Sequence, residues 1–372
     1  MKPFHSLSGK KVLVTGISGF KGGWLASLLI SIGAEVIGFS RGNLAKKSPF
    51  WFNTIRERVT VVFGDIRDLE RVRQTVEDHR PEIIFHLAAQ PLMRIAFDNP
   101  VETFRTNIVG TVNVLEAIRS SPSVKAAVVV TTDKVYSNPT CTKGCVETDQ
   151  LGGNEPYGVS KACCELVVGA YRSSYFRDAG AAIATARAGN VIGGGDFSEP
   201  RLVPDIIRAL SAGVQIPIRG NLDGIRPWQH VLESASGYLQ LANRLLQPNG
   251  REYATSFNFA PAITDQGVTV RDVIRCIIDH WGSGHFDNRS MEVIRETREL
   301  RLNPSKAAHM LGWIPIYSWK NAVAETVRWY REYYDRTKSQ VATEIDMFDV
   351  IEDQFNTYMT RARQLGIEWA SR

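Results

Sequence analysis

The segment VVVTTDKVY, residues 128–136, begins as an apolar run and ends with an acid beside a base. A strand buried on both faces gains no packing from Asp133 and Lys134 at its end, because both charges would have to be desolvated. An adjacent acid and base is instead what a reaction requires when one proton is delivered and another is removed. The alternative is a solvated pair of charges in a surface loop.

A second reactive pair follows in the segment YGVSK, where Tyr157 and Lys161 stand four residues apart. On a helix these side chains share a face, so the ammonium group is expected to lower the pKa of the phenol toward that of a useful general base. Thr132, at the end of the preceding apolar run, can hydrogen-bond the same substrate oxygen as Tyr157. The motif is short and common, and it gains weight from its place downstream of a glycine-rich loop.

That loop, TGISGFKGGWLA, places Gly16, Gly19 and Gly22 three residues apart, directly after the first apolar run. Glycines here allow a tight turn and let a pyrophosphate approach the N–H groups that open a helix, which predicts a dinucleotide site. At the end of the next run, an acid would bind the ribose of NAD, but Ser40 and Arg41 stand there. Arg41 suits the 2′-phosphate of NADP or is a solvated loop charge, so these residues leave NAD and NADP open.

Short β-rich runs alternate with helical patterns and would bring these residues together. The runs lie at residues 11–16, 34–40, 59–65, 82–89, 125–132 and 181–188. This alternation predicts an α/β fold, a Rossmann-like doubly wound parallel sheet that binds ligands at the carboxyl ends of its strands. GDI, after the third run, then places Asp65 and Ile66 where an acid can contact adenine. Further helices are expected at 202–213, 226–246 and 268–282.

Three regions are expected along the chain. Residues 1–188, joined by part of 225–262, form the NAD-binding domain, and residues 189–335 mainly form a smaller interleaved substrate-binding lobe. Residues 336–372 form a helical C-terminal tail, which we interpret as a surface or subunit-contact helix without readable chemistry.

Composition excludes several classes of function. The 372 residues carry a formal net charge of +5, with 44% hydrophobic and 22% charged residues, which is typical of a soluble globular protein. No block of basic residues indicates a nucleic-acid partner, and no apolar run approaches the roughly 18 residues of a membrane span. Cys141 and Cys145 have no second Cys/His pair at a suitable spacing, so free thiols, no metal site and a cytoplasmic location are expected.

In this order the motifs resemble the extended short-chain dehydrogenase/reductase family. The segments that carry the resemblance are TGISGFKG, HLAAQ, TNIVGTVNVLEA, TTDKVY and YGVSK. Within that family the chain is similar to the NAD-dependent sugar-nucleotide 4,6-dehydratases, above all the group that acts on CDP-glucose, through GDIRD, HLAAQPLMR, KGCVETDQLGG, ARAGNVIGGGD, RLVPDIIRA and IRPWQHVLE. The likeness covers about residues 10–261. The chain departs from the group at TTDKVY, EPYGVSK and TGISGFKGGW, which leaves the exact sugar nucleotide open.

The resemblance implies a lyase that dehydrates CDP-D-glucose to its 4-keto-6-deoxy form. Tyr157, tuned by Lys161 and assisted by Thr132, would take the C4 hydroxyl proton while NAD takes the hydride. Lys134 would then remove the C5 proton, Asp133 would protonate the departing C6 hydroxyl, and the hydride would return to C6. A sugar 4-epimerase needs only the Tyr, Lys and Thr, whereas elimination needs a further acid–base pair. A 4-epimerase, a dehydratase of another nucleotide sugar, and a non-catalytic dinucleotide sensor or scaffold are the alternatives.

The resemblance also implies binding residues, a partner and a pathway. The implied cofactor-binding residues are Gly16, Gly19, Phe20, Gly22, Arg41, Asp65, Ile66, Leu87, Ala88, Ala89, Asn107, Tyr157 and Lys161. The implied substrate-binding residues are Gln90, Asn190, Arg201, Arg219, Arg226 and His230. The guanidinium fork of Arg226 suits a pyrophosphate, and His86 is interpreted as structural. A homodimer, or a dimer of dimers, in deoxysugar biosynthesis for the lipopolysaccharide O-antigen would be usual for such proteins.

Overall fold

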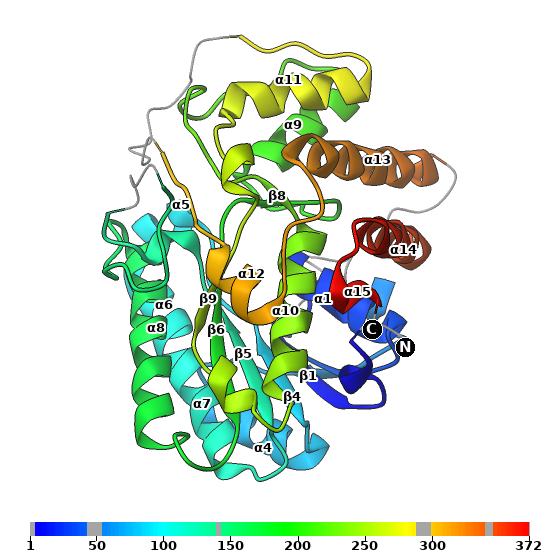
Figure 1. Cartoon of the computed structure of the whole chain (residues 1–372). Helices are drawn as coiled ribbons and strands as arrows, with labels where there is room; N and C mark the ends of the chain where they lie inside the picture. The colour runs from blue at the N-terminus through cyan, green and yellow to red at the C-terminus, as the bar shows by residue number, and fades with distance from the viewer. Residues whose placement is uncertain (1–3, 43–53, 139–142, 288–298, 339–344, 372) are drawn as a thin grey trace.

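The computed structural model describes residues 4–42, 54–138, 143–287, 299–338 and 345–371 (Figure 1). Cys141 lies outside these ranges. The strands are β1 (Lys11–Thr15), β2 (Glu35–Ser40), β3 (Thr60–Phe63), β4 (Ile83–His86), β5 (Ala126–Val130), β6 (Ala182–Ala188), β7 (Val191–Ile192), β8 (Gln229–His230) and β9 (Ser256–Phe259). The α-helices are α1 (Phe20–Ser31), α4 (Leu69–His79), α5 (Met93–Asp98), α6 (Pro100–Phe104), α7 (Gly110–Ser120), α8 (Pro156–Ser174), α9 (Leu202–Ser211), α10 (Val231–Leu245), α11 (Val270–Trp281), α12 (Ser305–Leu311), α13 (Trp319–Thr337), α14 (Phe348–Gln364) and α15 (Glu368–Ser371). Shorter helical turns are η1 (His5–Leu7), η2 (Arg105–Val109), η3 (Asp133–Val135), η4 (Gly250–Tyr253) and η5 (Ile263–Asp265).

Within the described residues, seven strands form one sheet in the order β3-β2-β1-β4-β5-β6-β9. Every neighbouring pair is parallel, so the carboxyl ends of all seven strands lie along one edge. The strand order reverses between β1 and β4, which is the point where open α/β sheets bind their ligands. The expected doubly wound Rossmann-like sheet is confirmed.

Alternation along the strands builds a core on each face of this sheet. Val12, Val14 and Phe85 pack with α1 and α10 on one face. Leu13 and Ile84, their neighbours in sequence, pack with α4 and α7 on the other face. A shift of one residue would exchange the two faces, so both cores fix the register of the strands.

A smaller layer containing α9, α11 and α13 lies over the carboxyl edge of the sheet (Figure 1). The helix expected at 226–246 begins only at Val231, because His230 is the N-cap and Gln229 and His230 form β8 against β7. Pro227 explains the difference, since proline lacks the N–H of a helical ladder and disfavours helical geometry in the residue before it. The division of the chain near residues 188 and 335 stays a prediction.

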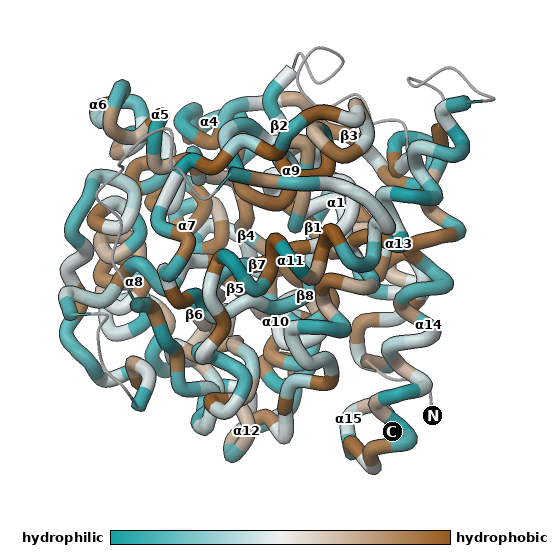
Figure 2. The backbone as a smooth tube through the Cα atoms, turned by 90° about the horizontal axis from the view of Figure 1, so that it is seen from above, coloured by the Kyte–Doolittle hydropathy of each residue, from teal (hydrophilic) through white to brown (hydrophobic). Residues whose placement is uncertain are grey.

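The C-terminal segment is helical where it is described, and α14 buries one face while its other face is exposed. Helix α14 packs on α1, and Figures 1 and 2 both show α13 and α14 along the same side of the molecule. Tyr358 is fully buried, and the ring of Trp369 stacks on Phe4 with centroids 5.3 Å apart. The buried residues of α14 recur three to four positions apart, as in Ile351, Phe355 and Tyr358, which is the spacing of one helix face.

Candidate active site

A cavity of about 1370 Å³ opens at the carboxyl edge of the sheet, between the sheet and the layer above it. Of the predicted site residues, its wall contains Gly16, Gly19, Phe20, Gly22, Arg41, Asp65, Ile66, Leu87, Ala88, Ala89, Thr132, Lys134, Tyr157, Lys161, Asn190, Arg201, Arg219 and Arg226. Pockets for one small ligand typically measure about 300–1,000 Å³. This cavity therefore has room for a dinucleotide and a second ligand.

The glycine-rich loop is wound tightly between β1 and α1. Gly16 has φ +74°, and a Cβ there would lie 2.7 Å from the backbone nitrogen of Ala88. A Cβ at Gly22 would lie 2.2 Å from the carbonyl oxygen of Gly16, so neither position tolerates a side chain. Gly19 is the N-cap of α1 and supplies no side-chain cap, which leaves the first N–H groups of the helix free to bind an anion at the cavity wall. These residues fit a dinucleotide pyrophosphate.

The far end of the cavity, at β2 and β3, has the polar groups of an adenosine site. The hydroxyls of Ser18 and Ser40 lie 2.6 Å apart, and Arg41 follows at the cavity wall. Asp65 lies at the end of β3, where hydrogen bonds from Arg67 hold the pKa of its carboxyl below the usual range. An ionised carboxylate is thus present near the strand ends although β2 itself ends in Ser40.

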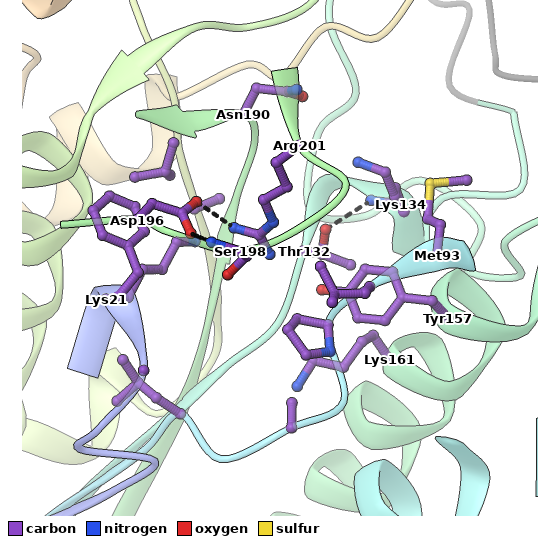
Figure 3. Close-up of a pocket in the computed structure, with 18 of the residues that line it drawn as sticks. Lys21, Met93, Thr132, Lys134, Tyr157, Lys161, Asn190, Asp196, Ser198 and Arg201 are labelled. Carbon is purple, nitrogen blue, oxygen red and sulfur yellow. Dashed lines mark hydrogen bonds and ion pairs between the residues drawn. The ribbon is translucent and has the colours of Figure 1, made fainter. Parts of the chain in front are cut away.

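Helix α8 presents Tyr157 and Lys161 to the cavity (Figure 3). Its start is well defined: Pro156 occupies the first turn, and the N-cap Glu155 accepts hydrogen bonds from the backbone of Tyr157 at 2.7 Å and of Gly158 at 2.6 Å. The expected lowering of the phenol pKa is not found. Burial raises the pKa of Tyr157 to about 12, and the hydrogen bond with Thr132 offsets this only in part. Burial also lowers the pKa of Lys161.

The acid–base pair forms the turn η3 directly after β5. Asp133 Oδ1 accepts hydrogen bonds from the hydroxyl of Thr132 at 3.0 Å and from Nζ of Lys134 at 3.2 Å. Asp133 is only 2% exposed and is not part of the cavity wall, whereas Thr132 and Lys134 are. Within the described chain its Oδ2 is buried without a hydrogen-bond partner. A proton on Asp133 therefore reaches the cavity by a movement of the side chain or through these two neighbours.

The opposite wall carries four of the predicted substrate residues, Asn190, Arg201, Arg219 and Arg226. Arg201 forms an ion pair with Asp196 at 3.0 Å and faces α8 across the cavity (Figure 3). Asn190 Oδ1 has no partner among the described residues, so it is available to a ligand. Arg226 is buried at the wall, and Arg219 contacts Asp205 at 3.3 Å. A wall with several guanidinium groups suits a diphosphate.

Three predicted binding residues, Gln90, Asn107 and His230, are not on the cavity wall. The side-chain amide of Gln90 bonds the backbone of Leu92 in its own loop and the hydroxyl of Thr103 in α6. Asn107 lies in η2 and is 1% exposed, and it links the backbone of Gln90 to the hydroxyl of Ser160. Both residues therefore brace the wall and do not form it.

His230 is fully buried, caps α10 through the N–H of Leu232, and packs between Trp24 and Tyr317. Burial lowers the pKa of His230 to about 3. It supports the helix and is not placed to contact a nucleotide. His86 is likewise structural, as expected, with its ring bonded to Thr15 at 2.7 Å and Thr111 at 3.1 Å.

Lys21 is a cavity residue that the sequence analysis missed. Burial, and next the charge of Arg201, lower the pKa of Lys21 to about 7, while Asp133 opposes the shift. The signal was a lysine in the first turn of the phosphate-binding helix, where the helix dipole already disfavours a cation. Asp196 was also missed, because its role as partner of Arg201 depends on how a loop folds.

Metal and membrane sites receive no support from the described part of the chain. Within those ranges no group of three or more His, Cys, Asp or Glu residues is arranged to hold a metal ion. None of the described helices combines the length and apolar character needed to span a bilayer.

Comparison with known proteins places this geometry among nucleotide-sugar enzymes. Residues 13–326 match the family model described as GDP-mannose 4,6 dehydratase. The chain is 40% identical over 333 residues to the CDP-glucose 4,6-dehydratase of Salmonella typhimurium, which covers 87% of this chain and 91% of that protein. It is 28% identical over 337 residues to a dTDP-glucose 4,6-dehydratase of Xanthomonas campestris, with 86% and 92% covered. The solved dTDP-glucose 4,6-dehydratase of Streptomyces venezuelae, with NAD bound, matches with a TM-score of 0.72 at 26% identity and covers 87% of this chain and 97% of that one.

Proposed function

This chain belongs to the GDP-mannose 4,6 dehydratase family, and we propose that it is an NAD-dependent hydro-lyase that converts CDP-D-glucose to CDP-4-keto-6-deoxy-D-glucose. One observation carries the proposal. The turn with Asp133 and Lys134 lies beside Tyr157 and Lys161 at the cavity that the glycine-rich loop also lines. Tyr157, Lys161 and Lys134 thus line one cavity, with Asp133 buried directly behind Thr132 and Lys134.

The first step is proton removal from the C4 hydroxyl by Tyr157, with Thr132 orienting the same oxygen. NAD, which Gly16, Gly19 and Gly22 would hold, would supply a hydride acceptor for C4, a hydride donor for C6, and a positive ring charge that would favour the Tyr157 phenolate. Lys161 holds its charge close to the tyrosine on the same face of α8. Burial raises the pKa of Tyr157 to about 12, so a positive charge near the phenol favours this step.

The second step is elimination of water across C5 and C6. Lys134 takes the C5 proton, which the 4-keto group acidifies, and Asp133 gives a proton to the departing C6 hydroxyl. For these roles the lysine must be neutral and the aspartate protonated. One proton moved from Lys134 Nζ to Asp133 Oδ1, across their 3.2 Å hydrogen bond, creates this state from the ion pair. Elimination leaves Lys134 protonated and Asp133 ionised, which restores the ion pair. A second proton transfer from Lys134 to Asp133 prepares the pair for the next turnover.

Binding of the sugar nucleotide is assigned to the wall opposite α8. Arg201, Arg219 and Arg226 supply guanidinium groups for the diphosphate, and the free Oδ1 of Asn190 supplies an acceptor. Choice of CDP over other nucleotides rests on the 40% identity to the Salmonella enzyme.

The assay is incubation with NAD and CDP-glucose, UDP-glucose, dTDP-glucose or GDP-mannose, followed by mass spectrometry for the loss of one water. We expect a dehydrated 4-keto product that is formed fastest from CDP-glucose. A galactose-configured product without loss of water would instead identify a 4-epimerase. A different preferred nucleotide would overturn the substrate, and binding of NAD without turnover of any sugar would overturn the enzyme proposal.

We further propose a cytoplasmic homodimer, alone or as half of a dimer of dimers, that supplies deoxysugars for lipopolysaccharide O-antigen. Exposed apolar side chains on neighbouring helices support the dimer: Val101 in α6 is 64% exposed, Val109 in η2 46% and Leu166 in α8 62%. Light scattering of the purified chain tests the dimer.

A further inference from the structure

The Glu165 carboxylate, on α8, is buried behind the catalytic residues and is saturated with hydrogen bonds. Oε1 accepts from Thr131 at 2.5 Å and from Nε of Arg187 at 3.0 Å. Oε2 accepts from Thr185 at 2.6 Å, from Nη2 of Arg187 at 3.0 Å and from Ser256 at 3.1 Å. All five residues are less than one-tenth exposed. The donors come from β5, β6 and β9, so one carboxylate ties the helix to three strands or strand ends.

The Glu165–Arg187 pair holds both flanks of the turn that carries the acid–base residues. Thr131, which donates to Glu165, directly precedes Thr132. On the other flank, Arg187 Nη1 donates to the hydroxyl of Tyr136 at 2.9 Å, and that hydroxyl donates to Asn258 at 2.8 Å. The turn η3 (Asp133–Val135) therefore lies between two anchors that end in the same ion pair.

The same helix carries the redox residues. Tyr157, Lys161 and Glu165 stand at four-residue intervals on α8, and the Glu165 charge favours the protonated form of Lys161. A buried ion pair adds little net stability compared with apolar packing of the same volume. The ion pair instead fixes the relative orientation of its partners, because charge-assisted hydrogen bonds hold both side chains in one geometry.

We propose that the Glu165–Arg187 pair is a positioning device that fixes the Asp133–Lys134 turn against the Tyr157–Lys161 face of α8. Oxidation at C4 and elimination across C5 and C6 act on adjacent carbons of one sugar, so the two sets of groups must keep a fixed separation. The expected effect on catalysis rests on the proposed function, but the hydrogen bonds that hold the turn do not.

Two threonines that donate to this carboxylate provide a matched test. Thr131→Val and Thr185→Val each remove one buried hydroxyl donor from Glu165, but only Thr131 leads into the catalytic turn. We expect Thr131→Val to lower kcat for dehydration by about tenfold with KM unchanged, and to accumulate NADH because elimination lags behind oxidation. Thr131→Ser, which keeps the hydroxyl, should restore turnover. Thr185→Val should stay within about twofold of wild-type kcat at a similar loss of thermal stability.

Amide hydrogen exchange of the segment 131–136 tests the anchors without any substrate. We expect faster exchange in this segment for Thr131→Val and Tyr136→Phe, and wild-type exchange for Thr185→Val. Unchanged exchange in Thr131→Val, or equal effects of the two valine variants on exchange, would overturn the proposal. An inactive wild-type protein that still shows the exchange difference would instead overturn only the proposed function.

Discussion

In the proposed mechanism, Asp133 and Lys134 extend an alcohol oxidation to an elimination, and the role of each depends on the other. Lys134 Nζ lies 3.2 Å from Asp133 Oδ1, so the pair can exchange a proton without help from solvent. We expect Lys134→Ala to lower dehydration by roughly 10²- to 10⁴-fold, the usual contribution of a general base. Hydride transfer should persist, because Tyr157, Lys161 and Thr132 are unchanged. Absorbance of NADH after mixing with CDP-glucose, followed beside product formation, separates the two steps.

Lys125→Ala is the matched control for this variant. Lys125 is exposed and directly precedes β5, so it stands at the opposite end of the strand that leads to Lys134. Its removal should leave both hydride transfer and dehydration unchanged. Full dehydration by Lys134→Ala would show that another group takes the C5 proton.

Lys21 leads to a prediction about protons taken up on binding. With a pKa of about 7, its amine is mostly neutral at pH 8 and mostly charged at pH 6. Anionic ligands in the cavity favour the charged form, so their binding at pH 8 should take up as much as one proton at Lys21. Calorimetry of NAD and CDP-glucose binding, in two buffers of different ionisation enthalpy, measures this uptake. It should fall at pH 6 and disappear in Lys21→Met.

Lys306→Met serves as the control, because burial also lowers the pKa of Lys306 but this lysine bonds Thr255 and Ser256 outside the cavity. Equal proton uptake by wild type and Lys21→Met would contradict the role of Lys21.

The reactive residues could be recognised from sequence because their motifs are local. Thr132, Lys134, Tyr157 and Lys161 follow a strand or share a helix face, and the strand and helix alone direct them to one cavity. Gln90, Asn107 and His230 could not be judged in this way. Whether an amide or imidazole faces ligand or protein depends on partners distant in sequence, as for His230, which packs between Trp24 and Tyr317.

Among the elements, α8 has one face toward the cavity and an apolar face on the outside of the molecule. One face carries Tyr157 and Lys161 at the cavity, while Val159, Cys163 and Leu166 form a partly exposed apolar stripe on the outer face. In a symmetric helix pair this stripe would meet its own copy. We expect Leu166→Glu to weaken the proposed dimer by at least about a hundredfold, because carboxylates would be desolvated at the interface. Sedimentation or light scattering over a range of concentrations measures the effect.

Leu365→Glu provides the comparison, since Leu365 is 57% exposed near the end of α14, away from this stripe. It should leave the mass of the particle unchanged. A Leu166→Glu variant that remains dimeric would exclude α8 as the contact.

Long periodic elements were predicted well, and short ones were not. The strands β1, β4, β5 and β6 could be recognised as apolar runs, because strands buried on both faces have no alternation to obscure them. The two-residue strands β7 and β8 have no such signal, since they form only when residues 191–192 and 229–230 meet. The buried face of α14 was not predicted, because its aromatic and polar residues concealed one apolar face.

Across the whole molecule, Glu233 joins three segments that the sequence places far apart. This residue of α10 accepts N–H bonds from Ile316 at 3.0 Å and Tyr317 at 2.6 Å, and a hydroxyl bond from Tyr358 of α14 at 2.9 Å. The separation of these segments explains why sequence patterns did not reveal the contact. The C-terminal helix is thereby connected to α10 and, through its packing, to the cofactor helix α1.

This contact predicts how stability changes with pH. Burial raises the pKa of Glu233 to about 7 from an ordinary value of 4.5, although its hydrogen bonds and Arg361 oppose the shift. Between these values the folded chain holds a proton that the unfolded chain has released, so this stabilisation is complete below pH 4.5 and is lost as the pH rises through 7. Glu233→Gln keeps the shape and removes the titration. Relative to this variant, the free energy of unfolding of the wild type should fall by roughly 3 kcal/mol between pH 4.5 and pH 8. Urea denaturation at several pH values, with the exposed Glu77→Gln as control, measures the difference, and parallel curves for wild type and Glu233→Gln would show that Glu233 stays ionised in the fold.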